Sequence, residues 1–336
     1  MKAKNQLRLD PLTGRWIAVA EGRSYRPSAF FPAPASEHIP SDRNCPFCPG
    51  AEEDTPPALE TYGPSGSWTV RVVPNLYPAF SEDEPMVTVS KGPVFTQAPA
   101  SGIHEVLILS QDHKATWADL DQDQIGVVMA AMRDRMDAHL HSSVIRYSQI
   151  ILNQGRAAGA SLEHPHAQLL GISFVPRELA DEQAGFSRFV GGCLLCATVE
   201  LEKTIGERVV VEEEEAAVIS PYWAQSAFEM LIVPKSHGPH LHTSSPYELK
   251  STGIAIKKAL KKLRDQVGDV AYNLVFHSSP YRAIGNFHWH VHLFPKLTTK
   301  AGFELGTGVS INIISPELAT RVLLGTEELD GTNTGK

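Results

Sequence analysis

Two rows of alternating polar residues occupy positions from which a β-strand would project them together. They are His164, His166 and Gln168, and then His288, His290 and His292. Side chains at i, i+2 and i+4 of a strand point to the same face. A neutral imidazole can attack phosphorus without first losing a proton near pH 7, so such a row could carry phosphoryl chemistry. A lone row could equally be three polar residues on a solvated face.

The rows belong to a pattern that occurs twice. Glu105-Val-Leu-Ile-Leu-Ser-Gln-Asp-His113 returns as Glu229-Met-Leu-Ile-Val-Pro-Lys-Ser-His237. The offset is constant, because 229 − 105, 237 − 113 and 288 − 164 are each 124. A fixed offset argues against an accidental polar face and predicts two units built on one plan.

A C-x-x-C pair precedes each copy, and zinc prefers four tetrahedral nitrogen and sulfur ligands. The two predicted ligand sets are Cys45, Cys48, His113 and His164, and then Cys193, Cys196, His237 and His288. The histidines of each set are 51 residues apart (164 − 113 and 288 − 237). A filled Cys2His2 site has no open position, so we expect two structural zinc ions per chain. His104 rivals His113 as a ligand, but Phe228 takes its place in the second copy.

Composition limits the class of protein. The chain has 336 residues, enough for two domains, and a net charge of −8 with no lysine- or arginine-rich block, which argues against a nucleic-acid partner. Neither a signal peptide nor an apolar run of about 18 residues is evident, so we expect a cytoplasmic protein without a membrane span. Thiols stay reduced there, which favours zinc over disulfides.

The hydrophobic pattern predicts an α+β fold of two tandem units, each an antiparallel sheet with a helix across it. Helices are expected over 121–140 and after the capping sequence Ser245-Pro246-Tyr247-Glu248. Buried strands are expected at 68–73, 106–109, 147–153, 165–172, 218–219, 230–233, 271–276 and 288–294. Residues 175–192 are interpreted as a linker, which divides the chain into domains at 1–178 and 179–336.

A small-residue turn, with Gly155, Gly159 and Ser161, lies before the first row and has no counterpart before the second. Backbone N–H groups in such a turn can approach phosphate oxygens. The turn therefore favours His166 over His290 as the nucleophile. Gln168 and Ser161 would assist it.

The segment NQGRAAGASLEHPHAQ (Asn153–Gln168) resembles the active-site segment of the galactose-1-phosphate uridylyltransferases, a branch of the histidine-triad superfamily. Similar segments span nearly the whole chain, among them PLTGRWIAVAEGRSYRP (Pro11–Pro27), CPFC (Cys45–Cys48), VRVVPNLYPA (Val70–Ala79), SQDHKAT (Ser110–Thr116) and YWAQSAFEMLIVPKSH (Tyr222–His237). The resemblance implies a double displacement in which His166 takes a nucleoside monophosphate from a nucleotide sugar. It also implies a homodimer whose sites are completed across the interface.

The resemblance assigns further residues to the substrate. It implies that Gln168 and Ser161 hold phosphoryl oxygens, that Arg23 and Arg26 lie near the sugar phosphates, and that Asn75 and Asn153 lie on the nucleotide side. Gly159 and Glu304 complete the predicted substrate-binding residues. The second C-x-x-C departs from familiar bacterial members, which bind another metal there, partly through a glutamate; it puts Glu229 in doubt as a ligand. The segment Gly302–Asn312 is closer to a plant-type branch that resembles ADP-glucose phosphorylase.

Three functions follow. The first is exchange of a nucleoside monophosphate between a nucleotide sugar and a hexose-1-phosphate, with UDP-glucose in galactose metabolism. The second is phosphorolysis of ADP-glucose, with inorganic phosphate as acceptor. The third, from another class, is a histidine-triad protein that binds or hydrolyses nucleotides. Gln168 argues against hydrolysis, because glutamine cannot shuttle a proton as a third histidine would.

Overall fold

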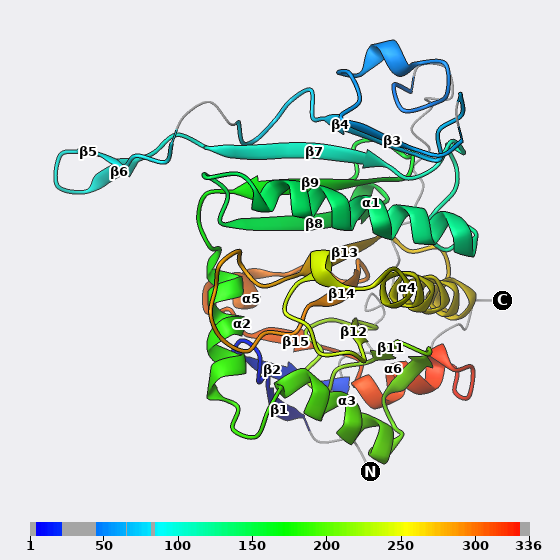
Figure 1. Cartoon of the computed structure of the whole chain (residues 1–336). Helices are drawn as coiled ribbons and strands as arrows, with labels where there is room; N and C mark the ends of the chain where they lie inside the picture. Colours follow the sequence, from blue (N-terminus) through cyan, green and yellow to red (C-terminus); the bar gives the residue numbers. More distant parts are fainter. Residues whose placement is uncertain (1–4, 22–44, 65, 82–84, 330–336) are drawn as a thin grey trace.

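A ten-stranded antiparallel sheet forms the centre of the computed structural model, which describes residues 5–21, 45–64, 66–81 and 85–329 (Figure 1). In spatial order its strands are β10 (Val209–Glu212), β11 (Ala216–Ile219), β12 (Met230–Pro234), β14 (His290–Pro295), β13 (Tyr272–His277), β8 (Tyr147–Gln154), β9 (His166–Ile172), β7 (Gly102–Ile108), β4 (Val70–Pro74) and β3 (Glu60–Tyr62). The mixed α+β class, with antiparallel sheets, is as the sequence predicts.

The two halves of the repeat meet inside this sheet, where β8 pairs with β13. Ile151 pairs directly with Val275, and these residues are separated by the repeat offset (275 − 151 is 124). The halves are therefore related by an approximate twofold axis through this pair. The two predicted sheets join edge to edge into one.

Two long helices cover one face of the sheet, α1 (Gln122–Leu140) and α4 (Pro246–Val267), and they pack against each other (Figure 1). Each is capped: Asp121 accepts from the Gln124 N–H, and Ser245 accepts from the Glu248 N–H. Both helices match the predicted ranges and bury their apolar stripe against alternate residues of the strands. In the described residues, no helix is long and apolar enough to cross a bilayer.

The opposite face of the second half is covered by shorter elements. They are α2 (Arg177–Arg188), α3 (Leu194–Ile205), α5 (Gly302–Thr307) and a three-stranded sheet of β1 (Gln6–Leu9), β2 (Trp16–Val19) and β15 (Ser310–Asn312). α6 (Pro316–Leu323) packs against α4 instead. Short 3-10 turns lie at η2 (Glu52–Asp54), η3 (Arg156–Ala158) and η4 (Leu241–Thr243).

The predicted linker at 175–192 is wrong, because most of it forms α2. Leu179, Glu182 and Phe186 lie on one face of this helix and are buried against the second half. Gly185 allows the close approach, since a Cβ there would lie 2.0 Å from the Leu12 carbonyl oxygen. The segment is short and has no side-chain N-cap, so local sequence gives little sign of the helix.

A separate hairpin, β5 (Val89–Lys91) and β6 (Phe95–Gln97), stands away from the body between β4 and β7 (Figure 1). All of its strand residues are exposed, including Phe95 at 70%. Val94 at its turn is 75% exposed. A lone two-stranded hairpin is marginally stable in water, so we expect another protein surface to pack against this one.

Gly253 sets the distance between α1 and α4, and its replacement should destabilise the fold. A Cβ there would meet Ile125 Cγ2 at 2.4 Å, and its carbonyl accepts from the Trp117 indole N–H. We expect Gly253→Ala to lower the free energy of unfolding by about 1–3 kcal/mol. Gly126→Ala is the matched control, because its Cβ would meet only the flexible Lys250 side chain and should raise stability by about 0.5–1 kcal/mol. Chemical denaturation measures both, and equal effects would contradict the steric argument.

Candidate functional site

His166 and Gln168 lie on the face of the sheet that α1 does not cover. β9 runs between β7 and β8, with Ile108 opposite His166. Ala167 and Leu169 alternate with these residues and enter the core beneath α1. The first half of the sheet therefore presents the first polar row as predicted, on the face opposite α1.

The His166 ring is held in one tautomer. Its Nδ1 lies 2.8 Å from the carbonyl oxygen of His164, so the N–H is at Nδ1 and the lone pair is at Nε2. Phe47, from the CPFC segment, packs edge-on with its centroid 5.4 Å from that of His166. Burial lowers the pKa of His166, which keeps the ring neutral at pH 7. The ring therefore has its lone pair at Nε2, in a fixed orientation.

The first predicted ligand set comes together beside this ring. Cys45, Cys48, His113 and His164 offer ligand atoms that all lie within 4.8 Å of one another. Cys48 Sγ is 3.4 Å from His113 Nδ1 and 3.6 Å from His164 Nδ1, close to the roughly 3.6 Å that a tetrahedral zinc ion would impose. His164 Nε2 donates to the Ser110 carbonyl at 2.8 Å, which leaves Nδ1 for a metal. The donors fit zinc.

The second predicted set forms a matching group of Cys193, Cys196, His237 and His288. His288 Nδ1 lies 3.4 Å from both sulfurs, and burial lowers the pKa of His288 to about 3, so the imidazole is neutral and able to bind a metal. Burial, and then the neighbouring Cys193, raise the pKa of the Cys196 thiol to about 12. A bound cation would offset the burial of Cys196 and the repulsion from Cys193, because it favours the thiolate form. This set also fits zinc.

A third group of possible ligands was not predicted. Glu182, His277, His290 and His292 are all buried and offer atoms within 4.8 Å of one another. His277 Nδ1 is 2.8 Å from Glu182 Oε1, and His290 Nε2 is 3.1 Å from His292 Nε2. Burial acts to raise the pKa of Glu182, but the nearby His277 and His290 together hold it well below its usual range. Three imidazoles and a carboxylate suit a transition metal.

Sequence reasoning missed this group for two reasons. Glu182 falls in the segment interpreted as a linker, and His277 lies outside the repeated row. The apolar spacing of Leu179 and Phe186 around Glu182 is the signal that could have revealed a buried glutamate. Familiar bacterial members bind a second-half metal partly through a glutamate, and in this chain Glu182, not Glu229, belongs to the third group of possible ligands.

This third group also makes the environment of the second histidine row different from that of the first. His290 has the same Nδ1 contact to the carbonyl two residues before it, at 2.8 Å. Its Nε2, however, faces His292 and Glu182 and its side chain is 0% exposed. Among the described residues, no carboxylate contacts the His166 ring in this way. The equivalent nitrogen of the second row is therefore occupied by protein groups.

The small-residue turn is anchored beside the first row. Gly155 and Gly159 have positive φ angles of 80° and 90°, which glycine adopts without strain. Asn273 Nδ2 donates to Asn153 Oδ1 at 2.7 Å and to the Ala158 carbonyl at 2.9 Å, so the second half fixes the turn. Ser161 follows the turn and is exposed. The register of β8 with β9 brings Asn153 across from His166, one residue beyond the Leu152–Ala167 pair.

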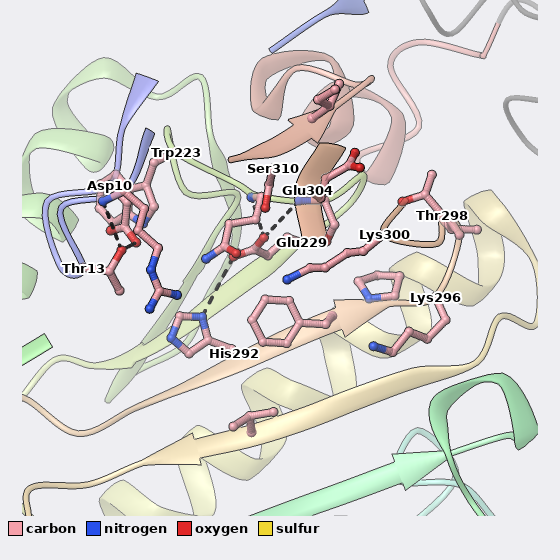
Figure 2. Close-up of a pocket in the computed structure, with 18 of the residues that line it drawn as sticks. Asp10, Thr13, Trp223, Glu229, His292, Lys296, Thr298, Lys300, Glu304 and Ser310 are labelled. Atoms are coloured by element: carbon pink, nitrogen blue, oxygen red, sulfur yellow. Dashed lines mark hydrogen bonds and ion pairs between the residues drawn. The ribbon is translucent and has the colours of Figure 1, made fainter. Parts of the chain in front are cut away.

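The remaining predicted substrate residues are more dispersed. Glu304 lines a cavity of about 780 Å³, together with Asp10 of the first half and Glu229, Lys296 and Lys300 of the second half (Figure 2). Burial raises the pKa of Glu229 to about 8, and its carboxylate accepts from the Gln225 and Ser226 N–H groups. Asn75 lies beside His104, at the end of β4. Arg23 and Arg26 lie outside the described residues.

Comparison with known proteins identifies the family. Residues 1–176 match the family model of the galactose-1-phosphate uridyl transferase N-terminal domain, and residues 179–313 match that of the C-terminal domain. The chain belongs to this family. Its relatives are transferases, and the chain is an enzyme of the same kind.

The relatives fall into two named activities. An ADP-glucose phosphorylase of Arabidopsis thaliana is 31% identical over 95% of this chain and 92% of its own length. A galactose-1-phosphate uridylyltransferase of Haemophilus influenzae is 31% identical over 88% of this chain and 84% of its own. The crystal structure of the Arabidopsis thaliana phosphorylase with bound ADP-glucose superposes with a TM-score of 0.81, at 29% identity, over 95% of this chain and 98% of that chain.

Metal content should follow the two cysteine-containing groups. Cys48→Ser and Cys196→Ser should each lose about one zinc ion per chain, since each removes a thiolate from a four-ligand site. His113→Ala should lose the first ion, whereas His104→Ala, its rival from the same strand region, should keep it. The melting temperature should fall with the metal. Elemental analysis of the purified variants measures this, and unchanged zinc in both cysteine variants would refute the ligand sets.

Proposed function

We propose that the chain transfers a nucleoside monophosphate from a nucleotide sugar to a phosphate acceptor through a covalent nucleotidyl-His166. The supporting observation is the single accessible lone pair on His166 Nε2, fixed by the Nδ1 contact to the His164 carbonyl. The lowered pKa of His166 keeps this nitrogen unprotonated at neutral pH. Holding a nucleophile in its attacking orientation accounts for a large share of a rate enhancement.

The reaction then proceeds in two displacements. His166 Nε2 attacks the α-phosphorus, a P–N bond forms, and the bond to the β-phosphate oxygen breaks, so that the hexose-1-phosphate leaves with the electron pair. An oxygen of the acceptor phosphate next attacks the same phosphorus and the P–N bond breaks. The proton stays on Nδ1, which donates to the His164 carbonyl throughout, and the Nε2 lone pair is restored when the P–N bond breaks.

The other predicted residues surround this step in the proposal. Gln168 and Ser161 donate to phosphoryl oxygens, and Gly159 and Asn153 line the nucleotide side with Asn75. Arg23 and Arg26 neutralise the sugar phosphates, and Glu304 binds the sugar. The two Cys2His2 groups would each hold a structural zinc ion, which would fix the backbone at His164 and at His288. We assign the catalytic domain to 1–178 and the second domain to 179–336.

UDP-glucose and a hexose-1-phosphate, as in galactose metabolism, are our first assignment of the substrates. Phosphorolysis of ADP-glucose is the second candidate, favoured by the similarity to the Arabidopsis thaliana phosphorylase over 95% of this chain. Incubation with each radiolabelled nucleotide sugar alone, followed by a chase with hexose-1-phosphate or inorganic phosphate, separates them. We also assign the chain to the cytoplasm, because cysteine thiolates that bind zinc persist in a reducing compartment.

The labelled intermediate should form on His166. Incubation with the productive nucleotide sugar should leave a nucleoside monophosphate that is stable in alkali and labile in acid, as phosphoramidates are. His166→Gly should abolish both labelling and transfer. His290→Gly is the matched control, because it makes the same change at the same position of the second row, and it should retain most of the labelling. Label on His290, or an active His166→Gly variant, would move the reaction to the second half.

We also propose that two copies associate as a homodimer. The hairpin β5–β6 supports this, because Val89, Val94 and Phe95 are at least half exposed on an element with little stability of its own. Apolar side chains gathered on a projecting element are typical of protein interfaces. The hairpin leaves the body between the two strands that carry Asn75 and His104, so a bound copy would lie near the site.

A charge on the hairpin should therefore dissociate the dimer. Phe95→Glu should shift the mass measured by light scattering from two chains to one, since a buried unpaired carboxylate is costly. Val190→Glu is the control, because Val190 is 94% exposed and lies elsewhere, between α2 and α3. A wild-type protein that is monomeric at micromolar concentration, or a Phe95→Glu variant that stays dimeric, would contradict the proposal.

A further inference from the structure

His104 lies outside the first zinc-type group and instead contacts the predicted phosphoryl-binding amide. Its Nε2 is 2.9 Å from Gln168 Oε1. Both residues lie on the face opposite α1, on neighbouring strands, because His104 is in β7 and Gln168 is in β9. Gln168 lies two residues after His166 on β9, so the His104–Gln168 pair is next to His166 on the same face of the sheet.

The tautomer of His104 is set by a backbone donor. The Ala79 N–H donates to Nδ1 at 3.2 Å, and a backbone N–H can only donate, so Nδ1 carries the lone pair. The ring proton of the neutral imidazole is therefore on Nε2. Asn75 Nδ2 also lies 3.1 Å from Nε2, but it is an amide NH2 group and cannot accept the ring proton, because the Tyr77 N–H fixes the Asn75 oxygen on the other side. The acceptor available to the Nε2–H is thus Gln168 Oε1.

This contact decides which end of the glutamine amide meets the substrate. With Oε1 held by the ring N–H, the NH2 group is the end available to an oxygen on the phosphorus. An amide in the opposite orientation would present its oxygen to an anionic group and repel it. The second half has no such pair, because Phe228 and His292 occupy the corresponding positions.

The turn after β4 builds the support for His104. The Asn75 N–H donates to the His104 carbonyl at 2.8 Å, which extends the β4–β7 pairing by one residue. Asn75 Oδ1 then closes the turn through Tyr77, which brings Ala79 over the ring. The turn therefore holds the His104 ring in place, and the ring holds the Gln168 amide.

We propose that His104 is a positioning residue for the transfer, which fixes the Gln168 amide so that its NH2 group donates to the phosphoryl oxygen. The proposal rests on the nucleotidyl transfer proposed above. No proton moves through His104, and its ring does not touch the substrate. Its effect should appear in the rate of the chemical step and should depend on Gln168.

The test is a double-mutant cycle on the full chain, read as the single-turnover rate of label transfer to His166. His104→Phe copies the residue of the second half and should lower this rate about tenfold, the value of about one hydrogen bond, with KM changed by less than about twofold. His104→Gln can donate to the same oxygen and should recover to within about threefold of wild type. In a Gln168→Ala background, His104→Phe should have no further effect.

A second variant tests the tautomer without touching the ring. Ala79→Pro removes the N–H that faces Nδ1, so the ring proton is free to leave Nε2 and the rate should fall about threefold. Equal slowing by His104→Phe with and without Gln168 would overturn the positioning role and leave a structural one. A full-rate His104→Phe would overturn it as well. If wild type takes up no label from any nucleotide sugar, the proposed function itself fails, and the inference with it.

Discussion

The site depends on a hydrogen bond between an imidazole and the backbone of its own strand. His166 donates from Nδ1 to the carbonyl two residues earlier, and His164 donates from Nε2 to Ser110. Neighbouring rings on one face thus expose opposite nitrogens. One nitrogen turns toward the cysteines, and the other turns toward the open face. Within three residues the chain thus presents one nitrogen to the proposed zinc ion and one nitrogen to the proposed phosphoryl transfer.

In the second half, the same row of strand histidines has different neighbours because α2 packs against it. α2 places Glu182 against His277 and His290, and places Phe186 beside His290. A carboxylate at that depth is stable only among cationic or metal-bound partners. The second row is part of a buried polar group, and the small-residue turn before the first row has no counterpart before the second. Duplication of the plan therefore did not duplicate the site.

Much of this was accessible from the sequence, and the exceptions have a common cause. The eight inner strands of the main sheet, α1, α4 and both cysteine-containing groups follow from local periodicity and from one constant offset, 124. The edge strands β3 and β10, the hairpin β5–β6 and the three-stranded sheet were not predicted. Glu182 and His104 were not interpretable in this way. Their partners come from separate segments, and those contacts depend on how α2 and the turn at Ala79 fold back. Residues whose role is set by distant neighbours leave little trace in local pattern.

The pairing of β8 with β13 has a consequence for how such a chain can exist at all. Either half alone would end in an open, largely apolar strand with a full row of unsatisfied N–H and C=O groups. Separate halves would have to find one another by diffusion, or pair with the wrong neighbour. Covalent linkage makes the correct neighbour permanently present at high effective concentration. In the linked chain, the two exposed edges that would promote aggregation, β8 and β13, pair with each other at the middle of the sheet.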